Sequence, residues 1–291
     1  MPLLRQRSVE FLIGSAPPVS LEVLALAALA SLAIVIAAWR FGALTVSGSI
    51  AAFFVGAACL GCGGFVVAAP LFVFFVSGTL LARVRPADRA GYDDVQHKRG
   101  ARDAAQVLAN GGAAAACAVA AGASALTAPG LAHAWQAASI GALAVAAADT
   151  WATELGARSP VLPRSIATGR VVKPGVSGGV TALGFVSSVA GGLAIGAAAS
   201  VFAPAMRTIG WIAAYGVIGF VGAAFDSLLG ATLQGAWRCD RCGAPCEASV
   251  HRCGAAAHIV TGASWLDNDG VNALATAAGA ALGFAAAAFA M

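Results

Sequence analysis

Charge is scarce in this sequence: Asp, Glu, Lys and Arg make up only 10% of the 291 residues, against about 25% in soluble domains. Long polar stretches are also missing, and the longest one, residues 234–268, is too short to bury a core of its own. These two absences exclude an ordinary water-soluble fold and a separate soluble domain. The chain is instead 59% hydrophobic, with a mean hydropathy of +0.84.

The apolar runs also lack the alternation of polar and apolar residues that a membrane β-barrel needs. They are rich in Ala, Leu and Gly, which favours helices of about 20 residues that cross a bilayer. We therefore predict an all-α fold, a polytopic transmembrane helix bundle that forms a single integral membrane domain over residues 1–291. About eight helices are expected, at 21–39, 42–61, 64–82, 104–126, 131–152, 177–202, 208–233 and 269–290.

The basic residues are distributed unevenly between the two sides of this predicted bundle. Eight spans place the loops 83–103, 153–176 and 234–268 on one side. Together with Arg40, these loops hold every Lys and Arg except Arg5, Arg7 and Arg207. The positive-inside rule makes that side cytoplasmic in a multi-pass protein of the cell membrane, with both termini outside. The net charge of +4 thus reflects topology, and we expect no nucleic-acid partner.

Acidic residues inside apolar helices are costly, so they suggest a functional site. Asp149 and Asp226 each end an apolar run in a helix that is directed toward the cytoplasmic side, and Glu154 follows Asp149 closely enough to reach the same place. For each carboxylate alone, a role in helix packing is an equally good interpretation. The helix of Asp226 also carries a small and polar stripe at four-residue spacing, made of Gly222, Asp226, Gly230 and Gln234.

Two glycine-containing segments are expected where neighbouring helices start on the cytoplasmic side. Asn110-Gly111-Gly112 lies in the first turns of one helix, and Ser177-Gly178-Gly179 opens another, just after Lys173 and Gly175. Glycine lets a phosphate approach the backbone, and a helix start offers unpaired N–H groups. The spacing fits neither a Walker A loop nor a dinucleotide fingerprint.

A basic cluster precedes the first of these segments: Lys98, Arg99 and Arg102. Such clusters usually fix topology or contact anionic lipid. Here carboxylates, glycine-rich segments and cations are expected on one membrane face, and together they are the groups needed to hold Mg²⁺ and a polyphosphate.

The loop 234–268 contains closely spaced cysteines and one histidine. A C-x2-C pair followed by further Cys and His residues is typical of a small zinc site, and a cytosolic position keeps thiols reduced. We predict a structural Zn²⁺ bound by four of five candidates, with free thiols or a redox-labile loop as the alternatives. The candidates are Cys239, Cys242, Cys246, His251 and Cys253.

Five segments in order, RDAAQVLANGG, AAADTWATELG, KPGVSGGVTALG, AFDSLLGATLQG and WLDNDGVNALAT, carry a wider resemblance. From about residue 98 to 275 the chain resembles an integral membrane family that includes the chloroplast phytyl-phosphate kinase of vitamin E salvage and many uncharacterised bacterial members. The Cys/His loop resembles a feature of the bacterial members.

This resemblance implies a kinase that transfers a phosphoryl group from CTP, or another nucleoside triphosphate, to a prenyl monophosphate lipid. In that reaction we assign Mg²⁺ to Asp149, Glu154 and Asp226, and phosphate contacts to Lys98, Arg99, Arg102 and Lys173. Asn110, Ser177 and Asn272 are expected to orient oxygens. The expected substrate-binding set is completed by Gly111, Gly112, Gly175, Gly178, Gly179 and Gln234.

Two other classes of function use similar residues. A cytidylyltransferase acting on a lipid phosphate also needs carboxylates and metal, but it releases pyrophosphate. A transporter of a phosphorylated lipid or small molecule usually has its polar residues near the bilayer midplane. The expected position of the polar residues near one face favours an enzyme.

Overall fold

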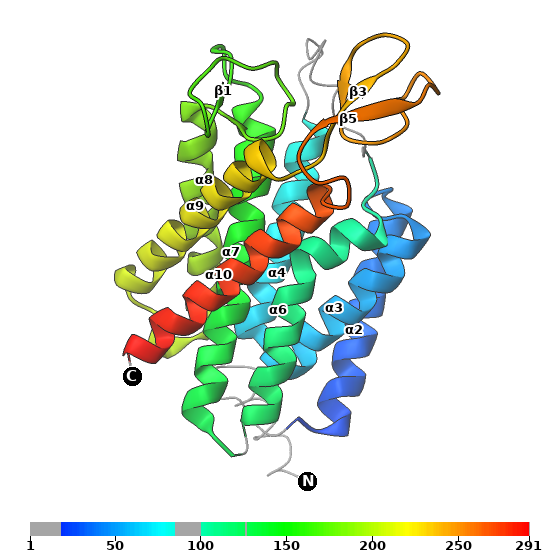
Figure 1. Cartoon of the computed structure of the whole chain (residues 1–291). Coiled ribbons are helices and arrows are strands. Elements are labelled where there is room, and N and C mark those ends of the chain that lie inside the picture. The colour runs from blue at the N-terminus through cyan, green and yellow to red at the C-terminus, as the bar shows by residue number, and fades with distance from the viewer. Residues whose placement is uncertain (1–18, 85–99, 126, 291) are drawn as a thin grey trace.

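The structure is a computed structural model that describes residues 19–84, 100–125 and 127–290. Within these residues, eight helices are long and apolar enough to cross a membrane (Figure 1), which confirms the predicted all-α membrane bundle. They are α2 (Leu21–Arg40), α3 (Val46–Gly63), α4 (Phe65–Arg83), α6 (Ala104–Ser124), α7 (Pro129–Gly156), α8 (Ala182–Phe202), α9 (Ile209–Thr232) and α10 (Asn268–Ala290).

The long apolar run over residues 41–82 is divided into α3 and α4 by one glycine. Gly64 has a φ of +69°, a left-handed conformation that glycine adopts without steric cost, and no other residue separates the two helices. The chain reverses at this point, so the run becomes two spans, as the sequence predicts.

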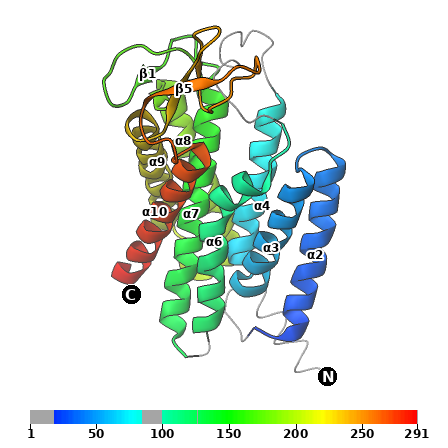
Figure 2. The same cartoon turned by 45° about the vertical axis from the view of Figure 1, so that its right-hand side comes forward.

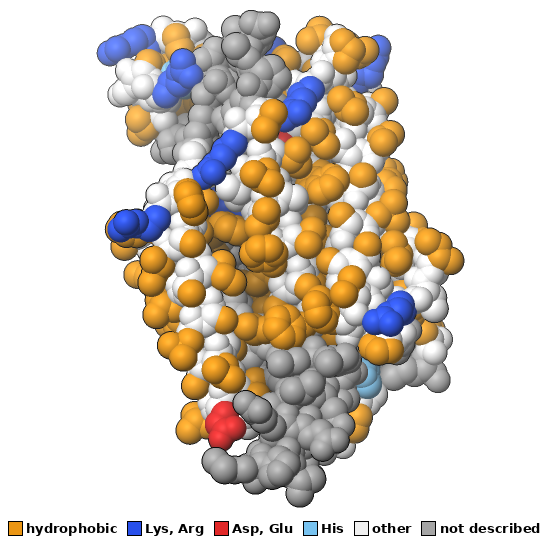
Figure 3. Space-filling model, turned by 180° about the vertical axis from the view of Figure 1, so that it is seen from behind, with side chains coloured by type: hydrophobic (Ala, Val, Ile, Leu, Met, Phe, Trp, Pro, Cys, Tyr) orange, Lys and Arg blue, Asp and Glu red, His pale blue; other side chains and the backbone are white. Residues whose placement is uncertain are grey.

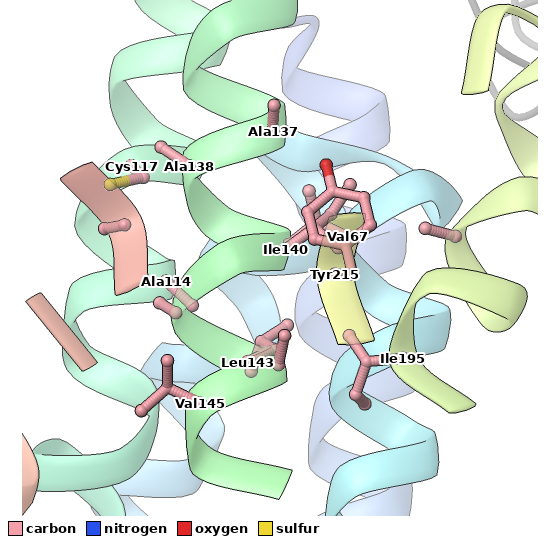
Figure 4. Close-up of a cluster of buried hydrophobic side chains, with 14 of the residues drawn as sticks. Val67, Ala114, Cys117, Ala137, Ala138, Ile140, Leu143, Val145, Ile195 and Tyr215 are labelled. Carbon is pink, nitrogen blue, oxygen red and sulfur yellow. The ribbon is translucent and has the colours of Figure 1, made fainter. Parts of the chain in front are cut away.

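Helix α7 is the centre of the bundle. It contacts α4, α6, α8, α9 and α10, and every residue from Gln136 to Ala148 is buried. A helix that is apolar on all faces belongs in a core. Figure 4 shows its Ile140 and Leu143 among side chains of the surrounding helices, including Tyr215 of α9.

Small residues let the backbones of these helices approach closely, which is a common way to pack helices in lipid. A Cβ added at Gly219 of α9 would lie 3.0 Å from the carbonyl oxygen of Ala144 in α7. A Cβ at Gly141 of α7 would collide with the carbonyl oxygen of Gly279 in α10. The close packing of α7 against α9 and α10 therefore depends on glycines, which have no side chain, at these two contacts.

Two small antiparallel sheets lie at one end of the bundle, as Figures 1 and 2 show. The first pairs β1 (Arg164–Ser165) with β2 (Gly179–Val180) between α7 and α8. The second follows α9 and has the order β4–β3–β5, with β3 at Ala236–Cys239, β4 at Pro245–Cys246 and β5 at Ala257–Thr261. A short 3₁₀ helix, η1 (Pro204–Met206), joins α8 to α9.

The surface of the bundle is mostly hydrophobic. Figure 3 shows apolar side chains over its flank, with most of the visible Lys and Arg side chains toward the end that carries the strands. This distribution agrees with an integral membrane protein whose charges gather at one end.

Candidate functional site

A cavity of about 680 Å³ opens at the end of the bundle that carries the strands. The ends or starts of α4, α6, α7, α8, α9 and α10 line it, together with the loops between them. Among the described residues its lining includes one guanidinium, that of Arg102, and six carboxylates: Asp149, Glu154, Asp226, Glu247, Asp267 and Asp269. The three carboxylates predicted from the sequence therefore lie on one cavity.

Asp149 of α7 and Asp226 of α9 are near enough to interact electrostatically. Gly222 makes this approach feasible, because a Cβ there would lie 2.7 Å from Cγ1 of Val145 on α7. The Oδ2 atom of Asp226 is buried and has no hydrogen-bond partner in the part of the chain that is described. A buried carboxylate oxygen is costly unless it is paired, so this atom suits a cation.

Glu154 lies in the last turn of α7, because that helix continues to Gly156 instead of ending near residue 152. It was expected to reach the site from beyond the helix end. Because α7 extends to Gly156, Glu154 belongs to the helix and its backbone position at the wall of the cavity is fixed.

The backbone of Arg102 is held by the turn between α2 and α3. Its N–H donates to the carbonyl oxygen of Ala43 (3.0 Å), and its own carbonyl oxygen accepts from the N–H of Thr45 (3.0 Å). Asp103 then starts α6 with a capping box, in which its carboxylate and the Gln106 side chain satisfy each other's backbone N–H groups. Thus part of the RDAAQ motif has a structural role, which is to fix the position of Arg102.

The side chain of Arg102 passes between α4 and α7. Its Cζ lies 5.3 Å from the ring centroid of Phe74 and 5.6 Å from that of Phe75. A Cβ at Gly78 would lie 2.7 Å from Nη2, so this glycine leaves room for the guanidinium. Burial lowers the pKa of Arg102, and the nearby Glu154 carboxylate opposes that shift.

The Nη1 atom of Arg102 is buried, and no described residue accepts a hydrogen bond from it. The guanidinium therefore has a donor available for an anion in the cavity. Lys98 and Arg99, which were expected to join Arg102, lie outside the described residues.

The Asn110-Gly111-Gly112 segment does not provide a helix start. It lies in the second and third turns of α6, where backbone N–H groups already bond within the helix, and the Asn110 side chain donates to the carbonyl oxygen of Gln106 (3.0 Å). Asn110 lines the cavity. Gly111 instead faces α3, since a Cβ there would lie 2.9 Å from Cγ1 of Val55, and Gly112 has open space beside it.

The segment at 177–179 does not open α8 either. That helix begins at Ala182, where the Thr181 side chain caps the N–H of Gly184 (3.0 Å). Residues 174–179, which we name the Ser-Gly loop, precede it and end in β2. The expectation of a helix start at Ser177 was wrong because Gly178 has a φ of +75°, which interrupts a helix.

The Ser-Gly loop rests directly on α9, one turn beyond Asp226. A Cβ at Gly178 would lie 2.6 Å from the carbonyl oxygen of Ser227, and one at Gly230 would lie 3.2 Å from the N atom of Gly178. All residues of the loop line the cavity: Pro174, Gly175, Val176, Ser177, Gly178 and Gly179. Lys173, just before the loop, is exposed and is not part of this lining.

Glu247 joins the Ser-Gly loop to the end of α9. Its Oε1 accepts a hydrogen bond from Oγ of Ser177 (2.6 Å) and another from Nε2 of Gln234 (3.3 Å). Gln234 is buried, with 4% of its surface exposed. Asn272 of α10 also lines the cavity.

Sequence reasoning missed three of the six carboxylates. The WLDNDG motif contained Asp267 and Asp269, and Asp267 also accepts a hydrogen bond from the N–H of Gly270 (2.9 Å) at the start of α10. For Glu247 the sequence held no signal except its nearness to the cysteines.

Four of the five predicted metal ligands form a cluster in which all ligand atoms lie within 4.8 Å of one another: Cys239, Cys242, His251 and Cys253. Sγ of Cys239 lies 3.5 Å from Sγ of Cys253, and Sγ of Cys242 lies 3.6 Å from Nδ1 of His251. Thiolates at 2.3 Å around a tetrahedral Zn²⁺ are separated by about 3.8 Å. The cluster therefore fits a metal ion.

The fifth candidate, Cys246, is not part of this four-residue cluster, and its Sγ donates a hydrogen bond to the carbonyl oxygen of Ala248 (3.5 Å). A backbone hydrogen bond from Cys242 is the largest of the influences that lower the pKa of Cys239 to about 6, whereas burial raises the pKa of Cys246. Thiolate is the form that binds metals, so the lowered pKa suits Cys239 to ligation.

Comparison with known proteins agrees with this architecture. The family described as integral membrane protein DUF92 matches residues 29–280. The chain belongs to the DUF92 family. The DUF92 chain is 32% identical to Protein PGR of Arabidopsis thaliana over 251 residues, covering 79% of this chain and 84% of that protein. No solved structure matches this chain. The family membership predicted from the five motifs is thereby confirmed.

Proposed function

We propose that this DUF92 protein is a membrane prenyl-phosphate kinase. It transfers a phosphoryl group from CTP, or another nucleoside triphosphate, to a prenyl monophosphate and forms the diphosphate. The observation that carries the proposal is the cavity in which six carboxylates meet Arg102 and the Ser-Gly loop at the end of a lipid-facing bundle.

Such an acidic lining repels a free polyphosphate, so an anionic substrate needs cations to enter it. The carboxylates of Asp149, Glu154 and Asp226 are the oxygen ligands that Mg²⁺ prefers. The buried Oδ2 of Asp226, which no described residue pairs with, supports this assignment. Bound Mg²⁺ would neutralise charge on the phosphates, which is the main requirement of phosphoryl transfer.

The other groups of the cavity bind and orient the phosphates. Arg102 can donate to an anion through Nη1, which has no partner among the described residues. The Ser-Gly loop lets phosphate oxygens approach its backbone at Gly175, which has no Cβ and lines the cavity. Asn110 and Asn272, which also line the cavity, supply amide groups.

In the reaction, an oxygen of the prenyl monophosphate forms a bond to the γ-phosphorus of the donor while the bond from that phosphorus to the bridging oxygen breaks. The nucleoside diphosphate leaves with the bonding electrons. The attacking oxygen is already anionic, so no strong general base is required, and the site's task is to hold two anions close together.

The prenyl chain lies among the apolar helices, and its phosphate lies at the membrane surface. The basic residues at the cavity end, including Arg158, Arg164 and Arg238, support a cytoplasmic position of that end by the positive-inside rule. Nucleoside triphosphates are present on that side.

We assign the Cys/His cluster to a structural zinc ion, since its sulfur and nitrogen ligands and their separations fit tetrahedral Zn²⁺. Metal analysis of reduced, chelator-free protein should find about one Zn²⁺ per chain. Cys242→Ser should lose this metal, and Cys246→Ser should retain it. A zinc-free wild-type protein would remove the assignment.

The test of the kinase proposal uses purified protein, Mg²⁺ and prenyl monophosphates of several chain lengths with each nucleoside triphosphate. Using labelled CTP, a kinase yields CDP and a prenyl diphosphate. Release of pyrophosphate with a CDP-linked lipid would identify a cytidylyltransferase instead. Uptake of substrate into vesicles without any chemical change would indicate a transporter.

A further inference from the structure

The three strands after α9 and their connecting turns, residues 236–261, form a small unit that we name the Cys/His module. It has two turns of the same kind, each with a Cys-Gly pair: Cys242 is followed by Gly243 with a φ of +68°, and Cys253 by Gly254 with a φ of +79°. Each turn presents two metal-binding residues on the same side. The module therefore holds its ligands in two matched turns.

The module has very little core of its own. Its strands are two to five residues long, and its buried residues are only Cys239, Cys246, His251 and Ala257. A three-stranded sheet this small needs additional stabilisation, commonly a metal. Its order should therefore depend on the metal cluster.

The same module reaches the cavity through Glu247, the residue after β4. Strand β4 is aligned on β3 by the pairing of Trp237 with Cys246, and the N–H of Cys239 donates to the carbonyl oxygen of Ala244 (2.9 Å). A metal ligand, Cys239, and the cavity residue Glu247 are thus connected through one short ladder. Movement at the cluster should be transmitted to Glu247.

Glu247 in turn holds two other segments that are distant in sequence. Its Oε1 accepts the short hydrogen bond from Ser177 in the Ser-Gly loop and the bond from Gln234 after α9. A hydroxyl donor bonds more strongly to a carboxylate than to a neutral acceptor. The loop next to the proposed phosphates is therefore fastened to the Cys/His module.

We propose that Glu247 is a positioning residue for the Ser-Gly loop, and that the metal in the Cys239, Cys242, His251 and Cys253 cluster keeps Glu247 in place. The consequence for phosphoryl transfer rests on the proposed function. The structural link itself does not, and it can be tested without any substrate.

The first experiment measures amide hydrogen exchange in the full chain, reconstituted in lipid nanodiscs. The reporters are the amides of Val176 and Gly179, which donate to the carbonyl oxygens of Lys173 and Val176, respectively. Removal of zinc by a chelator should raise their exchange rates by on the order of tenfold, through local opening of the loop. Readdition of Zn²⁺ alone should restore the original rates.

Variants distinguish the effect of the Glu247 side chain on the Ser-Gly loop from the effect of the metal. Glu247→Ala should retain about one Zn²⁺ per chain and still raise exchange in residues 174–179 by on the order of tenfold. Glu247→Gln keeps an oxygen acceptor for Ser177, so exchange should stay near the wild-type rate. Asp240→Asn is the matched control in the same module, since Asp240 is exposed and contacts His258 instead of the cavity.

Unchanged exchange of Val176 and Gly179 in both the zinc-free protein and Glu247→Ala would overturn the proposal. So would loss of activity in Glu247→Gln with a wild-type loop, because that result would make Glu247 a direct ligand of substrate or Mg²⁺. If the protein proves to have no kinase activity, the exchange results still decide whether the link exists.

If the kinase function holds, the link has a kinetic signature. Glu247→Ala should raise KM for the nucleotide on the order of tenfold, with a smaller effect on kcat, because the loop remains present but is poorly ordered. Glu247→Gln should restore most of the wild-type KM. A fall in kcat alone, without any change in KM, would contradict a positioning role.

Discussion

The guanidinium of Arg102 lies over the ring of Phe74, with its Cζ 5.3 Å from the ring centroid. The contact places a cation on the apolar wall of α4, directly beside the cavity. A cation over an aromatic face is stabilised when water is excluded. This contact and the fixed backbone of Arg102 hold the guanidinium in one orientation before any substrate binds.

The first prediction concerns the space that this orientation requires. Gly78→Ala should displace the guanidinium, because the new Cβ would lie 2.7 Å from Nη2. We expect turnover to fall by about tenfold in a folded protein, since small displacements of binding groups cost that much or more. Gly112→Ala is the control, because Gly112 has open space beside it. Equal activity of the two variants would argue against a role for Arg102.

The second prediction distinguishes two costs of an alanine at Gly178 in the Ser-Gly loop: a steric clash with α9 and backbone strain. Gly178 and Gly169 both have positive φ, and an alanine there costs about 1–2 kcal/mol in a left-handed conformation. Gly169 has no neighbour within 4 Å, whereas a Cβ at Gly178 would lie 2.6 Å from Ser227. Gly178→Ala should therefore lower both Tm and turnover more than Gly169→Ala does. Similar thermal scans for both variants would contradict the close packing of the loop on α9.

The third prediction concerns metal binding in the cavity. Asp226→Asn should leave a folded, membrane-inserted protein and reduce turnover about 10²-fold or more, because an amide is a poor Mg²⁺ ligand. Turnover and thermal stability should be measured together across a range of Mg²⁺ concentrations. Asp240→Asn removes an exposed carboxylate outside the cavity and should have no effect on either. Near-normal turnover of Asp226→Asn with unchanged Mg²⁺ dependence would exclude Asp226 as a ligand.

The fourth prediction concerns orientation in the membrane. Single cysteines introduced at Arg89, Arg164 and Arg241 should react with an impermeant thiol reagent only after the cytoplasmic face is made accessible. A cysteine at Arg207, at the other end of α8, should react from outside. The unaltered chain is the control for its native cysteines. Labelling of the Arg89 and Arg164 positions from opposite faces would refute this topology.

The helices could be predicted from the sequence because apolar length alone determines which segments can cross a bilayer. Asp149 and Asp226 could be placed together for a related reason: both lie in the C-terminal halves of helices that run in the same direction. Their convergence follows from topology and does not require knowledge of helix packing.

The details of the helix starts could not be predicted in this way. Ser177-Gly178-Gly179 has a composition suitable for a helix start, but its conformation is determined by contacts with α9 and by pairing with β1. Gly111 was interpreted as a phosphate-binding residue, whereas its neighbour is Val55 of α3. A glycine gives the same sequence signal whether it accommodates a ligand or an adjacent helix.

Glu247 was beyond sequence reasoning for a different reason. Ser177 and Gln234 become neighbours of Glu247 only when the Cys/His module folds back over the cavity. Long-range contacts of this kind depend on loop conformation, and no periodic pattern encodes that conformation. The cysteines identified the module, but not its contact with the site.

The burial of α7 on all sides has a consequence for how substrates enter. Gly141 and Gly219 mark places where backbones nearly touch, so rotation or sliding of α7 would create collisions instead of new contacts. The membrane part should therefore behave as a rigid frame during turnover. Admission of substrate and release of product must then come from the surface segments above it, and the rate of each cycle should follow their motion.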